Sequence, residues 1–256
     1  MKYFVYKLYK FFPYKLRKTI KKALPKGLPR KIWYSLLSSK KSKYFLFDYQ
    51  KAYGKSNAYE TYLDIQKSAF ERKIDNQWET EKNIIMLSDY LNSRFSKEKI
   101  IGICHGTRTG SEQSWFNEHL YKGSYVFGTD IGSDLEKYED TIYFDMNEDN
   151  LDWKNKFNFI YSNSWDHTFN PVSMLANWYS HLKQGGIMIL NHTVGHSVES
   201  YESVSETDPF SISSDELINM LQEINLETFL LDGFSRNNDE TLNPWIYVCG
   251  KKVNSE

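Results

Sequence analysis

Carboxylate and imidazole side chains follow two apolar segments in the second half of the chain. Asp166 and His167 come directly after FNFIYSNS, residues 157–164, and His192 lies in IMILNHT, residues 187–193. An imidazole whose pKa is near neutrality can take a proton from a reacting group, and a neighbouring carboxylate can orient it. We therefore expect Asp166, His167 and His192 to be catalytic.

Two other interpretations of these residues stay open. A single histidine is often a structural residue that hydrogen bonds hold in the core. His192 and His196 lie four residues apart, and together with the preceding carboxylate and imidazole they could bind a metal ion, because both groups ligate transition metals. The two histidines lie in an irregular segment rather than on a helix, so we expect no metal.

A second group of polar residues surrounds a glycine-containing turn. KIIGIC, residues 99–104, is an apolar run typical of a strand, and His105, Gly106, Arg108 and Gly110 follow it. Glycine permits positive φ and close backbone approach, and the helix after the turn would present unpaired N–H groups to an anion. This layout predicts a nucleotide-type cofactor loop.

Acidic residues end the next two apolar runs. Asp130 ends YVFGTD, residues 125–130, and lies 24 residues after Gly106, close to the spacing of an acid that holds ribose hydroxyls. Asp145 ends TIYFD, residues 141–145, and its carboxylate could accept a hydrogen bond from an exocyclic amine. A helix cap or a surface carboxylate is the alternative interpretation of each.

Strands and helices alternate from residue 99 onward, which predicts an α/β, Rossmann-like, seven-stranded sheet with helices on both faces. We expect strands at 99–104, 125–130, 141–145, 157–164, 187–193, 226–234 and 244–252. We expect helices at about 57–74, 78–94, 110–121, 171–182 and 215–223, and a polar loop at 194–212. The last two strands have no helix between them, so the last strand should be antiparallel in a mostly parallel sheet. Ligands of such sheets bind beyond the carboxyl ends of the strands, where the polar residues fall.

The chain divides into three parts by composition. We expect a basic aromatic arm at 1–47, a helical lead-in at 48–95 and the Rossmann-like domain at 96–256. The arm holds 14 Lys and Arg and no acid, whereas the remainder holds 18 basic and 33 acidic residues. Its prolines divide it into short helical pieces, at about 3–12, 14–24 and 30–38. Basic and aromatic side chains suit an anionic membrane surface; the protein's own acidic body and, least favoured, nucleic acid are the alternatives.

Composition excludes several classes of protein. A hydrophobic content of 40% with seven Trp argues against a disordered chain. No apolar run approaches the roughly 18 residues of a membrane span, and no secretory signal is present. Cys104 and Cys249 both lie in strand-like runs, which indicates reduced thiols. We therefore expect a cytoplasmic protein, with peripheral contact at the inner face of the membrane.

Residues 99–252 resemble the class I S-adenosylmethionine-dependent methyltransferases. The resemblance rests on CHGTRTG, VFGTDIG, YFDMNED, FNFIYSNSWDH, LKQGGIMIL and the closing pair of strands. It implies S-adenosyl-L-methionine as the cofactor, with its methionine part at Gly106 and Gly110, its ribose at Asp130, its adenine at Asp145 and Met146, and its sulfonium near Asn163. His105, Arg108 and Ile131 complete the expected cofactor-binding set.

Two positions depart from the family pattern. Cys104 stands where the family has an acid, two residues before its first glycine, and Arg108 stands where it has a further glycine. The Arg108 guanidinium would offer a bidentate partner to the methionine carboxylate or to an anionic substrate.

The resemblance implies methyl transfer, which we expect to a hydroxyl of a small-molecule or glycan acceptor in surface polysaccharide biosynthesis. The glycine turn and Asp130 would also serve an NAD-dependent oxidoreductase, although the antiparallel last strand argues against one. A non-catalytic scaffold of the same fold, docking at membranes through the arm, is a third alternative. The sequence does not indicate the oligomeric state.

Overall fold

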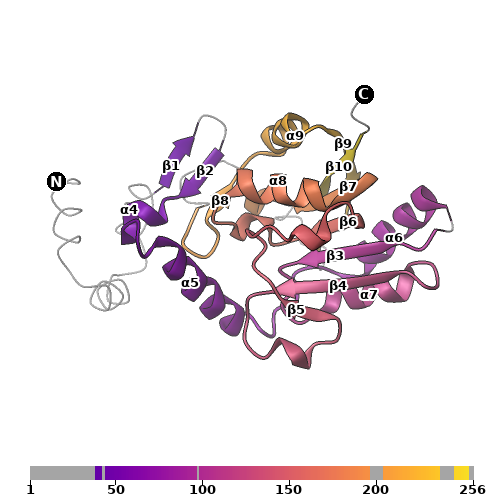
Figure 1. Cartoon of the computed structure of the whole chain (residues 1–256), viewed down its shortest axis with the longest axis horizontal. Helices are drawn as coiled ribbons and strands as arrows, with labels where there is room; N and C mark the ends of the chain where they lie inside the picture. The colour runs from indigo at the N-terminus through magenta and orange to yellow at the C-terminus, as the bar shows by residue number, and fades with distance from the viewer. Residues whose placement is uncertain (1–37, 42–43, 97, 197–203, 237–244, 254–256) are drawn as a thin grey trace.

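A seven-stranded sheet forms the centre of the molecule (Figure 1). The computed structural model describes residues 38–41, 44–96, 98–196, 204–236 and 245–253. The order of strands across the sheet is β5-β4-β3-β6-β7-β10-β9. Their bounds are β3 Ile101–His105, β4 Tyr125–Asp130, β5 Thr141–Tyr143, β6 Phe157–Ser162, β7 Leu182–His192, β9 Leu226–Asp232 and β10 Ile246–Lys252.

The strand directions confirm the predicted mixed sheet. Strands β5, β4, β3, β6 and β7 pair in parallel, and β10 pairs antiparallel with both β7 and β9. In register, His105 at the end of β3 lies opposite Thr129 on β4 and Ser162 on β6. The loops that follow these three strands therefore leave the sheet at one level, which is the edge where a ligand site is expected.

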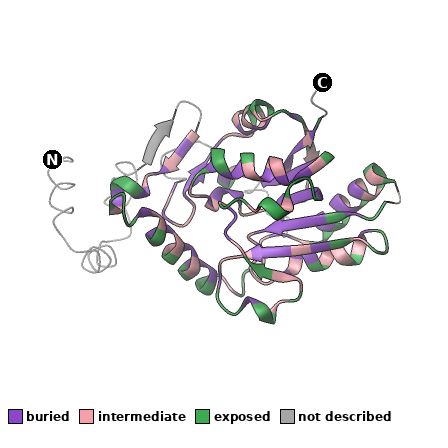
Figure 2. Cartoon of the chain, in the orientation of Figure 1, coloured by how far each residue is buried: buried purple, intermediate pink, exposed green. Residues whose placement is uncertain are grey.

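Helices cover both faces of the sheet, as predicted. Helices α6 (Glu81–Phe95) and α7 (Ser111–His119) cover one face, and α8 (Pro171–His181) and α9 (Ser214–Glu223) cover the other. Successive strand side chains point to opposite faces, so on β7 Ile187 and Ile189 join the first layer and Met188 and Leu190 the second. Figure 2 shows the central strands almost wholly buried between these layers.

The lead-in segment covers the carboxyl ends of the strands. It contains α4 (Tyr49–Tyr53) and α5 (Ala58–Arg72), and α5 lies beside the ends of β3 and β4 in Figure 1. Buried aromatic residues join the lead-in to the rest of the molecule, as in the contact of Tyr62 with Phe169 at 5.4 Å between ring centroids. Helix α5 of the lead-in thus forms a wall over the site edge, whereas the α6 part of the lead-in packs on one face of the sheet.

A small antiparallel sheet lies beside α4 and was not predicted. It consists of β1 (Ser38–Lys41), β2 (Tyr44–Phe47) and β8 (Phe210–Ser211), in the order β1-β2-β8. Strands β1 and β2 come from residues that the composition assigns to the arm, and Ser38 begins a strand where a helical piece was expected to end. Residues 1–37, which include nearly all of the three expected helical pieces, lie outside the described residues.

Two further segments differ from the sequence prediction. The polar loop expected at 194–212 contains, in its described part, a 3-10 turn at Val194–His196 and strand β8. Strand β7 begins at Leu182, five residues before the start that the sequence predicts. Gly185 adopts φ +76° within the strand. The register between β6 and β7 shifts between Phe157 and Phe159. Within the described ranges, no helix combines the length and apolar character needed to cross a membrane.

Candidate active site

The glycine turn after β3 packs directly on the segment that follows β6. The backbone N–H groups of Gly106 and Thr107 donate to the Thr129 carbonyl at 2.8 and 3.2 Å. Gly106 adopts φ +74°, and a Cβ at this position would lie 2.8 Å from the Cβ of Ser164. Any larger residue would therefore push the two loops apart at the point where they meet.

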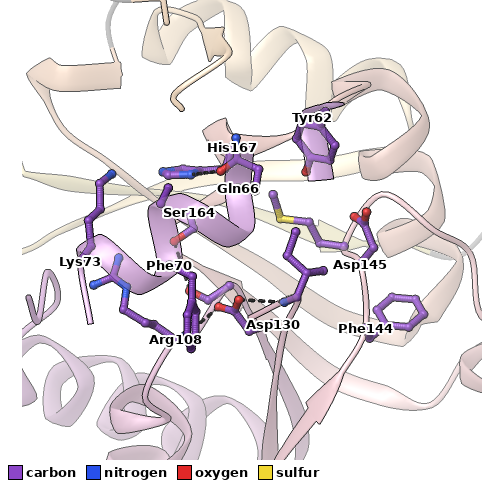
Figure 3. Close-up of a pocket in the computed structure, with 14 residues that line it drawn as sticks. Tyr62, Gln66, Phe70, Lys73, Arg108, Asp130, Phe144, Asp145, Ser164 and His167 are labelled. Atoms are coloured by element: carbon purple, nitrogen blue, oxygen red, sulfur yellow. Dashed lines mark hydrogen bonds between the residues drawn. The ribbon is translucent and has the colours of Figure 1, made fainter. Parts of the chain in front are cut away.

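Arg108 and Asp130 are joined through the backbone of the turn. The Arg108 N–H donates to Asp130 Oδ2 at 2.8 Å, and the N–H groups of Ile131 and Gly132 donate to Asp130 Oδ1 at 2.7 and 3.1 Å (Figure 3). Burial raises the pKa of Asp130, and these three N–H donors oppose that effect. Arg108 has φ +51°, the conformation for which glycine is favoured, and its guanidinium donates to the Asn76 carbonyl.

Asp145 is held in place by residues from two segments. Its Oδ2 accepts from the Tyr59 hydroxyl at 2.7 Å, and its Oδ1 accepts from the backbone N–H and side-chain amide of Asn147 at 2.9 and 2.8 Å. The next residue, Met146, is buried. The loop after β5 therefore presents a fixed acid beside an apolar side chain.

These residues line a cavity that we call the α5 pocket. The space between its walls, part of which is open to solvent, is about 550 Å³. Helix α5 forms one wall and the strand ends form the other (Figure 3). The lining residues used below are Gln66, Phe70, Lys73, Gly106, Arg108, Asp130, Ile131, Phe144, Asp145, Met146, Ser164 and His167.

A second and larger cavity, the histidine pocket, adjoins the first. Its volume is about 1190 Å³. Its lining includes Lys73, Gln77, Gly106, Arg108, Glu112, Asn163, Ser164, Asp166, His167, His196, Asp208 and Arg236. Gly106, Ser164 and His167 line both pockets, so the two cavities meet beside these residues.

His167 is oriented by α5. The Gln66 amide nitrogen donates to the carbonyls of Glu206 and Thr207, which turns its Oε1 toward His167 Nδ1 at 3.0 Å. Because an amide oxygen only accepts, His167 Nδ1 carries the proton in the neutral ring. The lone pair of Nε2 then faces Asp208 Oδ1 at 3.4 Å.

Two carboxylates flank this imidazole and differ in their environment. Burial raises the pKa of Asp166 to about 6, and its Oδ1 has no hydrogen-bond partner among the described residues. Burial would also raise the pKa of Asp208, but His167, Lys73 and the hydroxyls of Ser205 and Thr207 lower it to about 2. Asp208 is thus ionised across the physiological range, and it suits the stabilisation of an imidazolium.

His196 lies on the other side of Asp166. Its Nδ1 accepts from the Thr193 N–H at 2.9 Å, so its Nε2 carries the proton, and this nitrogen lies 3.7 Å from Asp166 Oδ1. Burial lowers the pKa of His196 to about 4. The ring is therefore neutral near pH 7 and has no lone pair that faces the carboxylate.

His192, which was expected to be catalytic, lines neither of these pockets. Its Nε2 lies 3.0 Å from the Ile212 carbonyl, and its ring stacks on Trp165. Burial lowers its pKa to about 4. The physical reason is strand alternation, because on β7 His192 shares the face of Met188 and Leu190 and points into the core.

Two of the expected cofactor-binding residues also take structural positions. His105 stacks on Trp178 at 4.4 Å between ring centroids, and its Nδ1 lies 2.8 Å from Thr129 Oγ1. Burial lowers its pKa to about 3. Gly110 caps α7 with φ +81°. Neither residue lines either pocket.

Asn163, which was expected near the sulfonium, lines the histidine pocket. Its amide nitrogen donates to Glu112 Oε1 at 2.8 Å. Glu112 and Asp208 were missed by the sequence analysis. Glu112 stands in the first turn of a helix, where acids occur for reasons of helix stability, and Asp208 falls in a segment without periodicity.

One group in the pocket has the composition of a metal site. Asp166, His167 and Asp208 each offer a ligand atom, and these atoms lie within 4.8 Å of one another. Lys73 Nζ lies 3.6 Å from Asp208 Oδ1 and already supplies a positive charge to this group. The absence of a metal stays a prediction.

Comparison with solved structures finds the same fold in methyltransferases of low sequence identity. A 1,6-didemethyltoxoflavin-N1-methyltransferase from Burkholderia thailandensis, solved with 1,6-didemethyltoxoflavin and S-adenosylhomocysteine, matches with a TM-score of 0.58 and 11% identity over 76% of this chain and 90% of that one. The chain has the class I methyltransferase fold. A methyltransferase from Aquifex aeolicus shares this fold, with a TM-score of 0.51 and 12% identity over 71% of this chain and 98% of that one.

The methyltransferase fold also occurs in an enzyme of another class. The [4+2]-cyclase SpnF matches with a TM-score of 0.54 and 11% identity over 77% of this chain and 95% of that one. No protein-family model and no curated protein matches the sequence. The fold is therefore established by structure, and the activity has to be argued from the site.

The residues of the site fit S-adenosylmethionine. The two loops that separate the pockets pack this closely because Gly106 has no Cβ beside Ser164. The α5 pocket offers two fixed acids, Asp130 and Asp145, between the apolar side chains of Ile131 and Met146, which suits the hydroxyls, amine and ring of a nucleoside.

Proposed function

We propose that this protein is an S-adenosylmethionine-dependent methyltransferase whose acceptor is a hydroxyl of a small molecule or glycan. The observation that supports it best is the pair of adjoining pockets beyond the strand ends, which share Gly106, Ser164 and His167. A methyltransferase has to hold its cofactor and its acceptor in two sites that meet at the transferred carbon.

The α5 pocket is the proposed site of the cofactor's nucleoside, and the methionine moiety would extend past Gly106 into the adjoining end of the histidine pocket, which Asn163 lines. Asp130 would accept from the ribose hydroxyls, since its carboxylate has lone pairs beyond the three that backbone N–H groups use. Asp145 and Met146 would contact the adenine, and Arg108 and Asn163 would lie at the methionine end. The cofactor supplies an electrophilic methyl group on a sulfonium.

The histidine pocket is the proposed acceptor site, and His167 is the proposed base. Its Nε2 lies 3.4 Å from Asp208 Oδ1, which belongs to another lining residue of this pocket, and the Nδ1 contact with Gln66 fixes the ring. His167 would take the proton of the acceptor hydroxyl, and the ionised Asp208 would stabilise the resulting imidazolium. Asp166, whose Oδ1 lies 3.9 Å from the same Nε2, would help to position the ring.

The charged residues of the chain are the basis for the proposed class of acceptor and for its proposed location. The histidine pocket is large, and its lining includes the cations Lys73, Arg108 and Arg236 as well as the acids Glu112, Asp166 and Asp208, which suits a polar acceptor. The basic arm at 1–47 suits contact with anionic lipid. We therefore propose an acceptor of surface polysaccharide biosynthesis, methylated at the cytoplasmic face of the membrane.

Calorimetry tests the cofactor assignment. The protein should bind S-adenosylmethionine and S-adenosylhomocysteine, and Asp130→Ala should weaken both, because the ribose loses its acceptor. Binding of NAD alone would replace the proposal with an oxidoreductase. Binding of none of the three would favour the non-catalytic scaffold.

A second experiment tests the reaction itself. The full chain, supplied with methyl-labelled S-adenosylmethionine and a panel of sugars, sugar nucleotides and polysaccharide fragments, should label a hydroxyl of at least one glycan. Label that appears only on nitrogen or carbon acceptors would contradict the hydroxyl assignment.

A further inference from the structure

Glu112 is a buried acid whose hydrogen bonding is incomplete. It lies in the first turn of α7, lines the histidine pocket and is only 3% exposed. Its Oε1 accepts from the amides of Gln77 and Asn163 at 3.1 and 2.8 Å. Its Oε2 has no hydrogen-bond partner in the described part of the chain. A buried carboxylate oxygen without a partner calls for a donor that the chain itself does not provide.

Both oxygens of the neighbouring acid, Glu79, are by contrast hydrogen-bonded. Its Oε2 accepts from the hydroxyls of Tyr161 and Tyr247 and from the amide of Asn191, each at 2.7 Å. Its Oε1 accepts from the amide of Asn83 at 2.8 Å. The charge of Glu79 adds to that of Glu112, so this part of the pocket favours a cation.

The protein cations leave Glu112 without an ion pair. The charge of Arg108 attracts that of Glu112, but the Arg108 guanidinium donates to the Asn76 carbonyl. No salt bridge to Glu112 forms among the described residues. Burial raises the pKa of Glu112 to about 7, with a further contribution from Glu79. The other titratable groups that face it are the Cys104 thiol on β3 and the Tyr161 hydroxyl on β6.

Glu112 also lies on the same face of the sheet as Cys104, which stands where the methyltransferase pattern has an acid. Cys104 is buried in the layer formed with α6 and α7, and Glu112 is near enough for its charge to help raise the pKa of the Cys104 thiol. An acid at position 104 of β3 would place a carboxylate on this face of the sheet. In this chain Glu112 of helix α7 supplies that carboxylate instead.

We propose that Glu112 binds the α-ammonium group of the cofactor's methionine moiety, in place of an acid at position 104. This inference rests on the proposed function. Arg108, which lines the same pocket, would take the α-carboxylate, so that the two side chains recognise the zwitterion together. Glu112 and its amide partners, Gln77 and Asn163, line the histidine pocket and not the α5 pocket, so the nucleoside part of the cofactor would not contact them.

The experiment compares two ligands that differ in the amino acid. S-adenosylhomocysteine carries the ammonium and carboxylate, whereas 5′-methylthioadenosine has neither. Isothermal titration calorimetry of Glu112→Gln should show at least a roughly tenfold loss of affinity for S-adenosylhomocysteine, the size expected for a lost charge-assisted contact. The affinity for 5′-methylthioadenosine should stay within about twofold.

The matched control is Glu118→Gln. Glu118 is an exposed acid on the same helix, so this variant removes the same charge without touching the pocket. It should bind both ligands as the wild type does. Circular dichroism of both variants shows whether α7 and the sheet are intact.

A second measurement gives the number of protons that the wild-type protein releases when it binds the ligand. A carboxyl with a pKa about 7 is half-protonated at pH 7, and a bound cation ionises it. Titrations in buffers of different ionisation enthalpy should therefore show release of about half a proton per S-adenosylhomocysteine bound at pH 7. The affinity should rise between about pH 6 and 8. Binding of 5′-methylthioadenosine should release none.

The outcomes separate this inference from the proposed function. Failure of the wild type to bind S-adenosylhomocysteine would contradict both. Binding without proton release overturns the inference alone. A folded Glu112→Gln variant that keeps its affinity for S-adenosylhomocysteine, or that loses both ligands equally, also overturns the inference alone.

Discussion

The imidazole of His167 owes its orientation to an amide from a different part of the chain. Gln66 is fixed by two carbonyls and in turn fixes His167 Nδ1, which leaves Nε2 toward the larger pocket. Asp208, on the opposite side, is ionised because its surroundings lower its pKa to about 2. This arrangement places a proton acceptor and its counter-charge where the two pockets meet.

Replacing His167 by Gln should lower kcat by about 10²- to 10⁴-fold, the usual contribution of a general base. Binding of S-adenosylhomocysteine should change little, because no proton moves in that step. The loss should shrink at high pH, where the acceptor hydroxyl ionises unaided. His119→Gln, at the far end of α7, serves as the control. An equal loss of kcat at every pH would point to a structural role for His167.

Asp166→Asn should stabilise the folded protein while it impairs the reaction. Burial raises the folded-state pKa of Asp166 from 3.8 to about 6, so the wild type loses stability as pH rises from about 4 through about 6, as the folded state resists ionisation. The neutral amide avoids this loss, which is on the order of 1–3 kcal/mol. Denaturant unfolding should show the gain at pH 8 and none below pH 4. A variant less stable than the wild type at pH 8 would contradict the assignment.

At the scale of elements, the regular pattern of the sequence predicted most of the sheet and its covering helices. Apolar runs of strand length and helical stripes are local signals, and their observed bounds differ by only a few residues. The β2–β8 pairing could not be predicted, because two residues of β8 pair with a strand more than 160 positions away. The burial of His192 could have been predicted from the sequence. His192 follows Met188 and Leu190 at a spacing of two residues, so its side chain lies on the same buried face of β7.

A substitution of Gly106, in the turn after β3, can separate the effect of a steric clash from the effect of an unfavourable backbone conformation. Gly106→Ala should weaken S-adenosylhomocysteine binding at least about tenfold, because the methyl group meets Ser164. Gly185→Ala is a matched control, since Gly185 has φ +76° but nothing lies within 4 Å of its Cβ position. Both variants should lose about 1–2 kcal/mol of stability from the left-handed conformation. Equal loss of affinity in both would show that the contact with Ser164 does not matter.

Over the whole molecule, charge is distributed unequally between the first 47 residues and the rest. The excess of basic residues in that segment is the basis for the proposed membrane contact. The small sheet shows where the arm can be removed, since β1 pairs with β2 and β2 pairs with β8 in the body of the protein. A deletion for testing the arm should therefore end before Ser38.

A chain that begins at Ser38 should bind S-adenosylhomocysteine as the full chain does and should lose binding to vesicles that contain anionic phospholipid. Each lysine or arginine near such a surface contributes about 1 kcal/mol, and salt weakens the attraction. Co-sedimentation at low and high salt measures the difference. Unchanged binding of the shortened chain to vesicles would contradict membrane contact through the arm.

The wall that α5 builds over the strand ends sets a limit for protein engineering. Tyr59 holds Asp145 and Gln66 holds His167, so a fragment that begins at β3 would keep the sheet yet lose the partners of a proposed cofactor residue and of the proposed base. The smallest active fragment therefore has to start upstream of α5. A transplant of this active site onto a related scaffold would need two separate pieces of sequence, one of which precedes the whole of the central sheet.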